Sequence, residues 1–288
     1  MLDSKNHALL SRRRLLGRAA GVAAAGLAPG LRGVFDPVWG AAGAGPYGPF
    51  KMSFQSYSLR HFTAIGEFVR EARRLGLGYV ELWRGHLDPD KPVTNVKGGT
   101  AFLRDAGLRV AAFGVEDFTA DHDRNERLFR FGKFLGVENL SANPSKDSFG
   151  SLEKLVSAYN IKIAIHNHGP EDQLWRKPEW VLESVKNLDP RIGSCADLGH
   201  FMRAGIDPIA ALELLGRRVL GCHFKDFDKQ GRDVVVGTGQ LDVTRTLKTL
   251  KKIGFSGPLS LEFEGDKEDP VPKMLRCLDT IRSAVKQI

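Results

Sequence analysis

Four of the eight histidines of the chain lie in three short segments that also carry carboxylates or an amide. These segments are Ile165-His166-Asn167-His168, Asp197-Leu198-Gly199-His200 and His223-Phe224-Lys225-Asp226. A fourth segment, Leu261-Glu262-Phe263-Glu264, adds two carboxylates. Imidazole and carboxylate together suit Mn, Zn, Fe or Co, and no run of cysteines indicates a thiolate site. A single strand histidine is more often a core residue than a ligand, but four in one group predict a metal site.

Each of these segments ends a short apolar run that is typical of a strand buried on both faces. Eight such runs follow one another along the chain. They cover residues 51–57, 79–83, 109–114, 139–143, 162–166, 192–197, 219–224 and 259–263. Helix-like stretches, several with apolar residues at spacings of three and four, alternate with the runs. They cover residues 62–75, 95–106, 124–135, 152–159, 178–185, 208–215, 243–250 and 271–285.

This alternation predicts an α/β protein, a single (β/α)8 TIM barrel over residues 45–288. Function in such a barrel lies at the C-terminal ends of the strands, so the four segments should meet at one face. Side chains alternate between the faces of a strand, so His166 and His168 point the same way, and either could be a ligand. The same holds for Glu262 and Glu264. We favour His166 and Glu262, which lie nearer to the barrel.

Several segments resemble the xylose isomerase-like TIM barrel superfamily, the sugar phosphate isomerase/epimerase family, over about residues 51–285. Asp197-Leu198-Gly199-His200 is similar to the family's Asp-x-x-His after strand 6, and His223-Phe224-Lys225-Asp226 to its His-x-Lys-Asp after strand 7. Residues 254–262 resemble the Gly-Tyr-x-Gly run that leads to a terminal Glu. Residues 237–242 resemble a Gly-x-Gly-x-x-Asp loop found before the last helix.

The resemblance implies one divalent metal ion, Mn, Zn, Co or Fe, held by His166, Asp197, His223 and Glu262. The family's epimerases have Glu at the strand-5 position, where this chain has His166. Those epimerases use two metal-bound carboxylates on opposite faces of the substrate as the acid and the base. Of that pair, this chain keeps Glu262.

The resemblance therefore implies a metal-dependent isomerase or epimerase that acts on a sugar or keto-sugar through an enediolate intermediate. Glu262 or Glu81, the latter near the end of the second strand, would remove the proton next to the carbonyl. His168, His200 and Lys225 would hold substrate hydroxyls or donate to the developing oxyanion.

Structural roles are also open for several of these residues. Glu81 and Glu116 could form salt bridges with arginines at the barrel mouth. Lys225 could pair with Asp226, and Asp197 could cap the turn that follows it. Three aromatic residues near strand ends could form a sugar-stacking wall or could pack in the core. They are Trp83, Phe113 and Trp175.

Three other functions compete with isomerisation. The same metal and carboxylates could dehydrate a polyol or cleave an oxidised glycoside, and the histidine at strand 5 favours this alternative. A nuclease of the endonuclease IV type would need further His and Glu ligands on the early strands, which here end in Gln55-Ser56-Tyr57 and near Gly114. A non-catalytic sugar-binding protein would carry the same fold without binding metal.

The N-terminal segment predicts export by the twin-arginine route. Ser11-Arg12-Arg13-Arg14-Leu15-Leu16 contains the twin-arginine core, a small apolar stretch covers residues 19–28, and Ala42-Gly43-Ala44 offers a cleavage site. We expect residues 1–44 to be an export signal and linker, and the protein to be periplasmic or otherwise exported. The apolar stretch is too short for a permanent span, so we expect no stable membrane anchor after its removal.

The charge and the cysteines restrict the partners. The formal net charge is +8, and residues 1–44 contribute six basic against two acidic residues, so half of the excess lies in the expected signal. The rest is weak support for a polyanion, and we expect a small carbohydrate and no nucleic acid as the partner. A homo-oligomer is possible.

Cys195 and Cys222 are out of phase on their strands, which argues against a disulfide between them.

Overall fold

One sheet of eight parallel strands forms the centre of residues 45–288, the part of the chain that the computed structural model describes. The strands are β1 (Lys51–Phe54), β2 (Tyr79–Leu82), β3 (Arg109–Phe118), β4 (Asn139–Pro144), β5 (Lys162–His166), β6 (Ile192–Asp197), β7 (Val219–Phe224) and β10 (Pro258–Leu261). Their order in the sheet is β1-β10-β7-β6-β5-β4-β3-β2. A parallel bridge between Gln55 and Glu81 joins the two ends of this order, so the sheet closes into a barrel. The predicted TIM barrel is confirmed.

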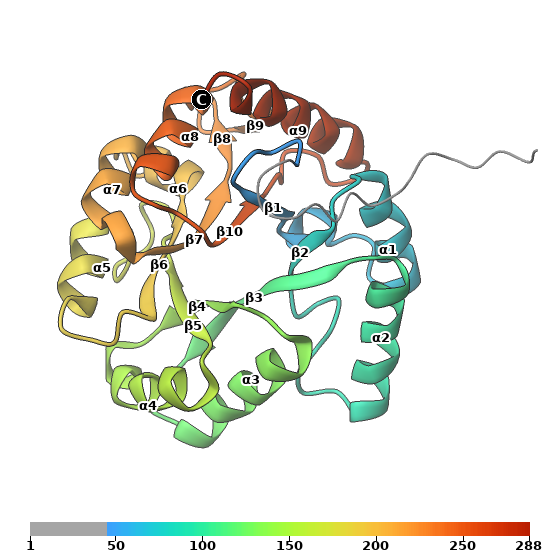
Figure 1. Cartoon of the computed structure of the whole chain (residues 1–288), viewed down its shortest axis with the longest axis vertical. Coiled ribbons are helices and arrows are strands. Elements are labelled where there is room, and N and C mark those ends of the chain that lie inside the picture. The colour runs from blue at the N-terminus through green and yellow to red at the C-terminus, as the bar shows by residue number, and fades with distance from the viewer. Residues whose placement is uncertain (1–44) are drawn as a thin grey trace, which may run out of the picture. The chain divides into compact units, whose positions relative to one another are not determined.

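Helices alternate with the strands along the chain and lie around the outside of the barrel (Figure 1). They are α1 (Ile65–Arg74), α2 (Val93–Asp105), α3 (His122–Leu135), α4 (Phe149–Tyr159), α5 (Pro178–Val185), α6 (Leu198–Arg203), α7 (Pro208–Leu215), α8 (Val243–Lys252) and α9 (Val271–Val285). Proline at the first turn and an Asp207 side chain that accepts a hydrogen bond from the amide of Ile209 (2.9 Å) start α7. Helix α2 forms despite Gly98 and Gly99. A Cβ on Gly99 would lie 2.5 Å from the side chain of Leu87, so the glycine allows the helix to approach Leu87 closely.

The strands carry the core, because their apolar side chains are buried on both faces of the sheet. Every residue of β6 and β7 is buried. Phe113 and Trp175 also belong to the core and not to a sugar-stacking wall. Phe113 packs against Phe131, and the Trp175 indole donates to the carbonyl of Pro144 (3.0 Å). All three cysteines are free, so the prediction that Cys195 and Cys222 form no disulfide with each other is confirmed.

Two elements next to the strand ends were not predicted. Helix α6 follows β6 directly, and a short antiparallel hairpin of β8 (Asp226–Phe227) and β9 (Asp233–Val234) follows β7. Asp226 holds the connection from this hairpin to α8, because its carboxylate accepts backbone hydrogen bonds at 2.9–3.0 Å from Gly237, Gly239, Gln240 and Leu241. The predicted Gly-x-Gly loop is therefore a backbone cradle around Asp226, which leaves Lys225 to other partners.

The predicted export signal, residues 1–44, lies outside the described residues, and the twin-arginine assignment stays a prediction. Within residues 45–288, none of the helices has both the length and the apolar character that a membrane crossing requires.

Candidate metal centre

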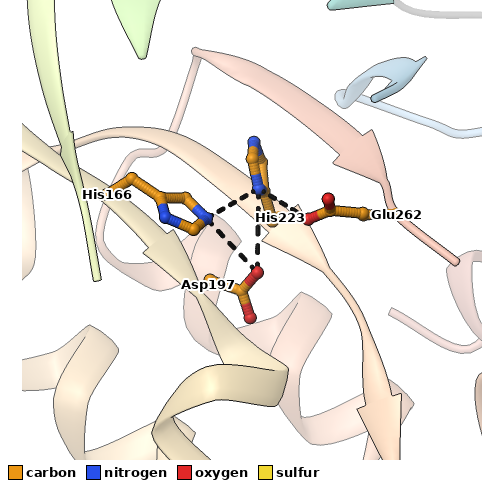
Figure 2. A group of neighbouring side chains, drawn as sticks. All are labelled: His166, Asp197, His223 and Glu262. Atoms are coloured by element: carbon orange, nitrogen blue, oxygen red, sulfur yellow. Dashed lines mark hydrogen bonds and ion pairs between the residues drawn. The ribbon is translucent and has the colours of Figure 1, made fainter. Parts of the chain in front are cut away.

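Four side chains from four neighbouring strand ends converge at one point inside the barrel mouth (Figure 2). His166 ends β5, Asp197 ends β6, His223 lies near the end of β7, and Glu262 directly follows β10. We call these residues the cluster. One nitrogen or oxygen atom from each residue lies within 4.8 Å of the corresponding atoms of the other three. The Nδ1 atom of His223 lies 3.0 Å from His166 Nε2 and 3.0 Å from Glu262 Oε2.

The cluster fits a divalent cation. All four residues are buried, yet Asp197 Oδ2 and Glu262 Oε2 accept no hydrogen bond. Buried carboxylate oxygens nearly always accept a hydrogen bond, so two that accept none at one point are suited to binding a cation. Two imidazole nitrogens and two carboxylate oxygens are a ligand set that Zn, Mn, Fe or Co accepts.

Asp197 both caps a helix and faces the cluster, with a different oxygen for each role. Its Oδ1 accepts from the amide of His200 at the start of α6 (2.7 Å), as the capping alternative expected. Its Oδ2 lies 3.4 Å from His166 Nε2. Asn167 locks the two strand ends together, because its amide side chain exchanges hydrogen bonds of 2.9 and 3.0 Å with the backbone of Asp197. The cap thus fixes the direction of the unpaired oxygen.

Neighbouring positive groups keep the two carboxylates of the cluster ionised. Burial by itself raises the pKa of Asp197, but His200 and the two imidazoles of the cluster hold it well below its usual range. Burial also acts to raise the pKa of Glu262, and the positive charges of Lys225 and His223 outweigh that effect and lower it. Both carboxylates are therefore ionised near neutral pH, as metal ligands must be.

A cavity of about 530 Å³ opens onto the cluster, and the three predicted substrate-binding residues all line it. They are His168, His200 and Lys225. Burial lowers the pKa of His168 and of His200 to about 4, so both imidazoles are neutral at pH 7 and can donate as well as accept hydrogen bonds. His168 lies beyond the end of β5 and is absent from the cluster, so of the two candidate strand-5 ligands the structure brings His166 to it.

Lys225 is fully buried beside three carboxylates at the cavity wall. It forms a short ion pair with Glu264, and its Nζ lies 3.6 Å from Glu262 Oε2 and 3.9 Å from Asp233 Oδ2. Although burial acts to lower the pKa of Lys225, these negative charges raise it, and the group stays cationic. The alternative pairing of Lys225 with Asp226 is wrong, because Asp226 faces the Gly-x-Gly loop.

Further cavity residues come from two elements that differ from the prediction: a 3-10 helix where the first strand was predicted to extend to residue 57, and the β8–β9 hairpin. Tyr57, in a 3-10 helix (Ser56–Leu59) after β1, packs edge-on against Trp83 with ring centroids 5.1 Å apart, and both rings line the cavity. The hairpin contributes Phe227 and Asp233. Burial raises the pKa of Asp233 to about 7. Of the three aromatic residues predicted for a sugar-stacking wall, Trp83 is therefore the one that reaches the cavity.

Glu81 lies behind His223 and does not line the cavity. Its Oε1 is 3.0 Å from His223 Nε2, on the side of the ring opposite to Glu262. The structure therefore places Glu81 away from any substrate in the cavity and in contact with a cluster residue instead, which does not fit its predicted role as a proton acceptor.

Glu116 occupies a different buried position, paired with Arg84 at 3.2 Å, as the salt-bridge alternative expected. Burial raises its pKa to about 7. Since the folded pKa lies above the unfolded one, this group favours folding below about pH 4.5 and loses that contribution as the pH rises through 7. Glutamine stays neutral at every pH, whereas the buried carboxylate of the wild type becomes charged at pH 8. From pH 4 to pH 8 we therefore expect the unfolding free energy of Glu116→Gln to rise by about 2–3 kcal/mol relative to that of the wild type. Urea unfolding at both pH values measures this, and a pH-independent difference would contradict it.

Residues 145–281 of the chain, slightly less than half of it, match the family model of the xylose isomerase-like TIM barrel, and this match supports the family resemblance. A protein of Methanocaldococcus jannaschii is 32% identical over 125 residues, 40% of this chain and 42% of that protein. The 3-dehydroshikimate dehydratase of Pseudomonas putida is 25% identical over 183 residues, 56% of this chain and 29% of the relative. The chain thus spans less than two thirds of the length of these relatives.

Solved structures share the fold. The crystal structure of 3-keto-D-glucoside 4-epimerase from Escherichia coli superposes with a TM-score of 0.65 at 16% sequence identity. The match covers 81% of this chain and 99% of that one. The barrel architecture is therefore shared over nearly the whole of the epimerase.

Proposed function

We propose that the chain is a divalent-metal-dependent isomerase or epimerase of a sugar or keto-sugar. One observation carries the proposal: two buried carboxylate oxygens without hydrogen bonds converge with two imidazole nitrogens on a cavity lined by aromatic rings and neutral imidazoles. The family match and the likeness to a keto-sugar epimerase support the same class of reaction.

The residues around the cavity divide the chemistry among them. A divalent ion held by the cluster would supply Lewis-acid polarisation of the substrate carbonyl. Glu262 is ionised and lines the cavity, so it can take the proton from the carbon next to the carbonyl and return it. Lys225, 3.6 Å from that carboxylate, is a cation that can stabilise the enediolate oxygen.

Other cavity residues would orient the sugar. The neutral rings of His168 and His200 can exchange hydrogen bonds with hydroxyl groups. The faces of Tyr57 and Trp83 provide an apolar surface for the C–H side of a sugar ring.

A dehydratase or lyase acting on a polyol or oxidised glycoside is the second candidate, and two observations favour it. His166 occupies the position where the family's epimerases have their second carboxylate, so Glu262 is the one base of that pair. Asp233, with a pKa raised to about 7, is a carboxyl that can be protonated at the same cavity and can give its proton to a leaving hydroxyl. The dehydratase relative from Pseudomonas putida supports this candidate.

Proton NMR of keto-sugars incubated with the metal-loaded protein in D2O separates the two candidates. Isomerisation or epimerisation introduces deuterium next to the carbonyl and yields a new sugar of unchanged composition. Elimination yields an unsaturated product. Neither product from any keto-sugar or polyol, in a protein that binds one metal ion per chain, would move the assignment to a binding protein.

The cationic side chains of the cavity already have partners in the protein, and we therefore expect an uncharged substrate and not a phosphorylated one. Among the described residues that line the cavity, the permanent cations are Lys225 and Arg203. Lys225 is held by its carboxylates, and Arg203 contacts Glu171 at 3.4 Å and His200 Nδ1 at 3.0 Å. A phosphate dianion would have to displace these partners. We expect kcat/KM for an uncharged keto-sugar to exceed that of its phosphate ester by at least about tenfold. A preference for the ester in a direct competition assay would contradict this.

A further inference from the structure

We propose that Glu81 is a positioning residue for the metal centre: it accepts the Nε2 hydrogen of His223 and so directs the Nδ1 lone pair of that ring into the cluster. The inference rests on the proposed metal centre and adds a residue to it. Glu81 contacts His223 and not the other three cluster residues, because His223 lies between them.

The two nitrogens of His223 face different partners. Nδ1 lies 3.0 Å from Glu262 Oε2 and from His166 Nε2, at the point where the cluster converges. The second nitrogen points away from the other residues of the cluster (Figure 2) and lies 3.0 Å from Glu81 Oε1. His223 and Glu81 are 1% and 2% exposed, so no solvent competes for this contact.

Two hydroxyl donors show that Glu81 is the acceptor in its hydrogen bond with His223. The hydroxyl of Ser141 on β4 donates to Glu81 Oε1 at 2.5 Å, and that of Ser260 on β10 donates to Oε2 at 2.6 Å. Ser260 also lies 2.8 Å from the hydroxyl of Ser53, which can donate to it in turn. Glu81 is thus surrounded by donors and acts as an acceptor only. The hydrogen between Glu81 and His223 therefore belongs to Nε2, so the nitrogen that a neutral His223 can offer to an ion is Nδ1.

A carboxylate in this place has two effects on a metal ligand. It fixes the rotation of the ring, and its negative charge makes the imidazole a stronger electron donor. The serine hydroxyls that hold Glu81 come from three strands, β1, β4 and β10, so the carboxylate itself has little freedom to turn. Removal of such a partner typically weakens metal binding by about 10–100-fold.

A second ion beneath His223 is a less suitable explanation of this region. Cys195 lies close enough to Glu81 and His223 for the three to form a possible ligand group. However, Glu81 Oε1 already accepts from Ser141 and from His223, which uses both of its lone pairs. Burial also raises the pKa of the Cys195 thiol, which opposes the thiolate that a metal needs.

The test compares Glu81→Gln with Glu116→Gln as a matched control. Glu116 is an equally buried glutamate on the neighbouring strand β3, and its described partner is Arg84 rather than a cluster residue. We expect the Kd for Mn²⁺ or Zn²⁺, measured by competition titration of the metal-free protein, to rise about 10–100-fold in Glu81→Gln. The control should stay within about twofold of the wild type.

Nitrogen-15 NMR of the imidazole of His223 provides a second readout that needs no bound ion. We expect a hydrogen on Nε2 and none on Nδ1, both in the metal-loaded wild type and in the metal-free wild type at a pH where the ring is neutral. If Glu81→Gln does not fold, Ser141→Ala and Ser260→Ala, which each remove one donor, should weaken metal binding to a smaller degree.

Two results would overturn the inference: wild-type affinity in a folded Glu81→Gln or in both serine variants, or an Nε2 without a hydrogen. Wild-type protein that binds no ion would contradict the proposed function instead, and the nitrogen spectrum of the metal-free protein would still decide where the hydrogen lies.

Discussion

Replacing Glu262 by glutamine is expected to lower kcat by at least about 10³-fold while the KM for the sugar changes by only a few-fold. A positioned general base contributes typically about 10²–10⁴-fold, and this glutamate also gives the cluster one of its two unpaired oxygens. Glutamine keeps the shape of the side chain and loses both the basicity and the charge. Initial rates, with deuterium exchange of the substrate in D2O as a second measure of proton removal, test the expectation.

Glu264→Gln is the matched control for this variant. Glu264 lies two residues further on, lines the same cavity and pairs with Lys225, yet it is not part of the cluster. We expect its replacement to lower kcat less than about tenfold, since it removes neither the base nor a ligand. Equal losses in the two variants would show that general charge in the cavity, and not Glu262 itself, is responsible.

Replacing Asp197 by asparagine is expected to abolish metal binding and the activity that depends on it. Asparagine can still accept the amide hydrogen bond that caps α6, but it lacks the negative charge of the aspartate, whose Oδ2 atom faces the cluster. At an ion concentration of 100 times Kd the wild type should gain about 2.7 kcal/mol in stability. That gain corresponds to about 5–10 °C in Tm for a domain of this size.

Thermal unfolding with and without the ion measures this effect. The variant should show no ion-dependent shift of Tm, although its metal-free Tm should stay close to that of the metal-free wild type. Asp207→Asn, which alters the corresponding cap of α7, is the control and should keep the full shift. A shift in Asp197→Asn as large as in the wild type would remove Asp197 from the ligand set.

The sequence predicted the ends of three barrel strands well because these strands are short apolar runs buried on both faces, whereas β1 ends three residues before its predicted end and β3 four residues beyond it. The predicted bounds of β5, β6 and β7 agree with the structure at every residue. His166, Asp197 and His223 could therefore be assigned to one face of the barrel before their distances were known. The choice between His166 and His168 could not be made in the same way. The alternation of side chains ends with β5 at His166, and His168 follows the loop instead.

The contacts of Glu81 could not be predicted, because they join residues that lie far apart in the chain. Its place near a strand end was evident, and a carboxylate at a strand end is a reasonable base. Only the barrel geometry shows that His223, 142 residues away, lies between Glu81 and the rest of the cluster. The β8–β9 hairpin escaped prediction for a different reason. Two strands of two residues each are too short to show any periodicity, so Phe227 and Asp233 gave no signal.

The metal content of the protein tests the central claim most directly. Elemental analysis of protein purified without chelator, and again after incubation with Mn²⁺, Zn²⁺ or Co²⁺ followed by desalting, gives the number of ions per chain. The arrangement of His166, Asp197, His223 and Glu262 predicts about one divalent ion per chain. A folded protein that retains no ion under any of these conditions would contradict the metal centre and the isomerase or epimerase function built on it.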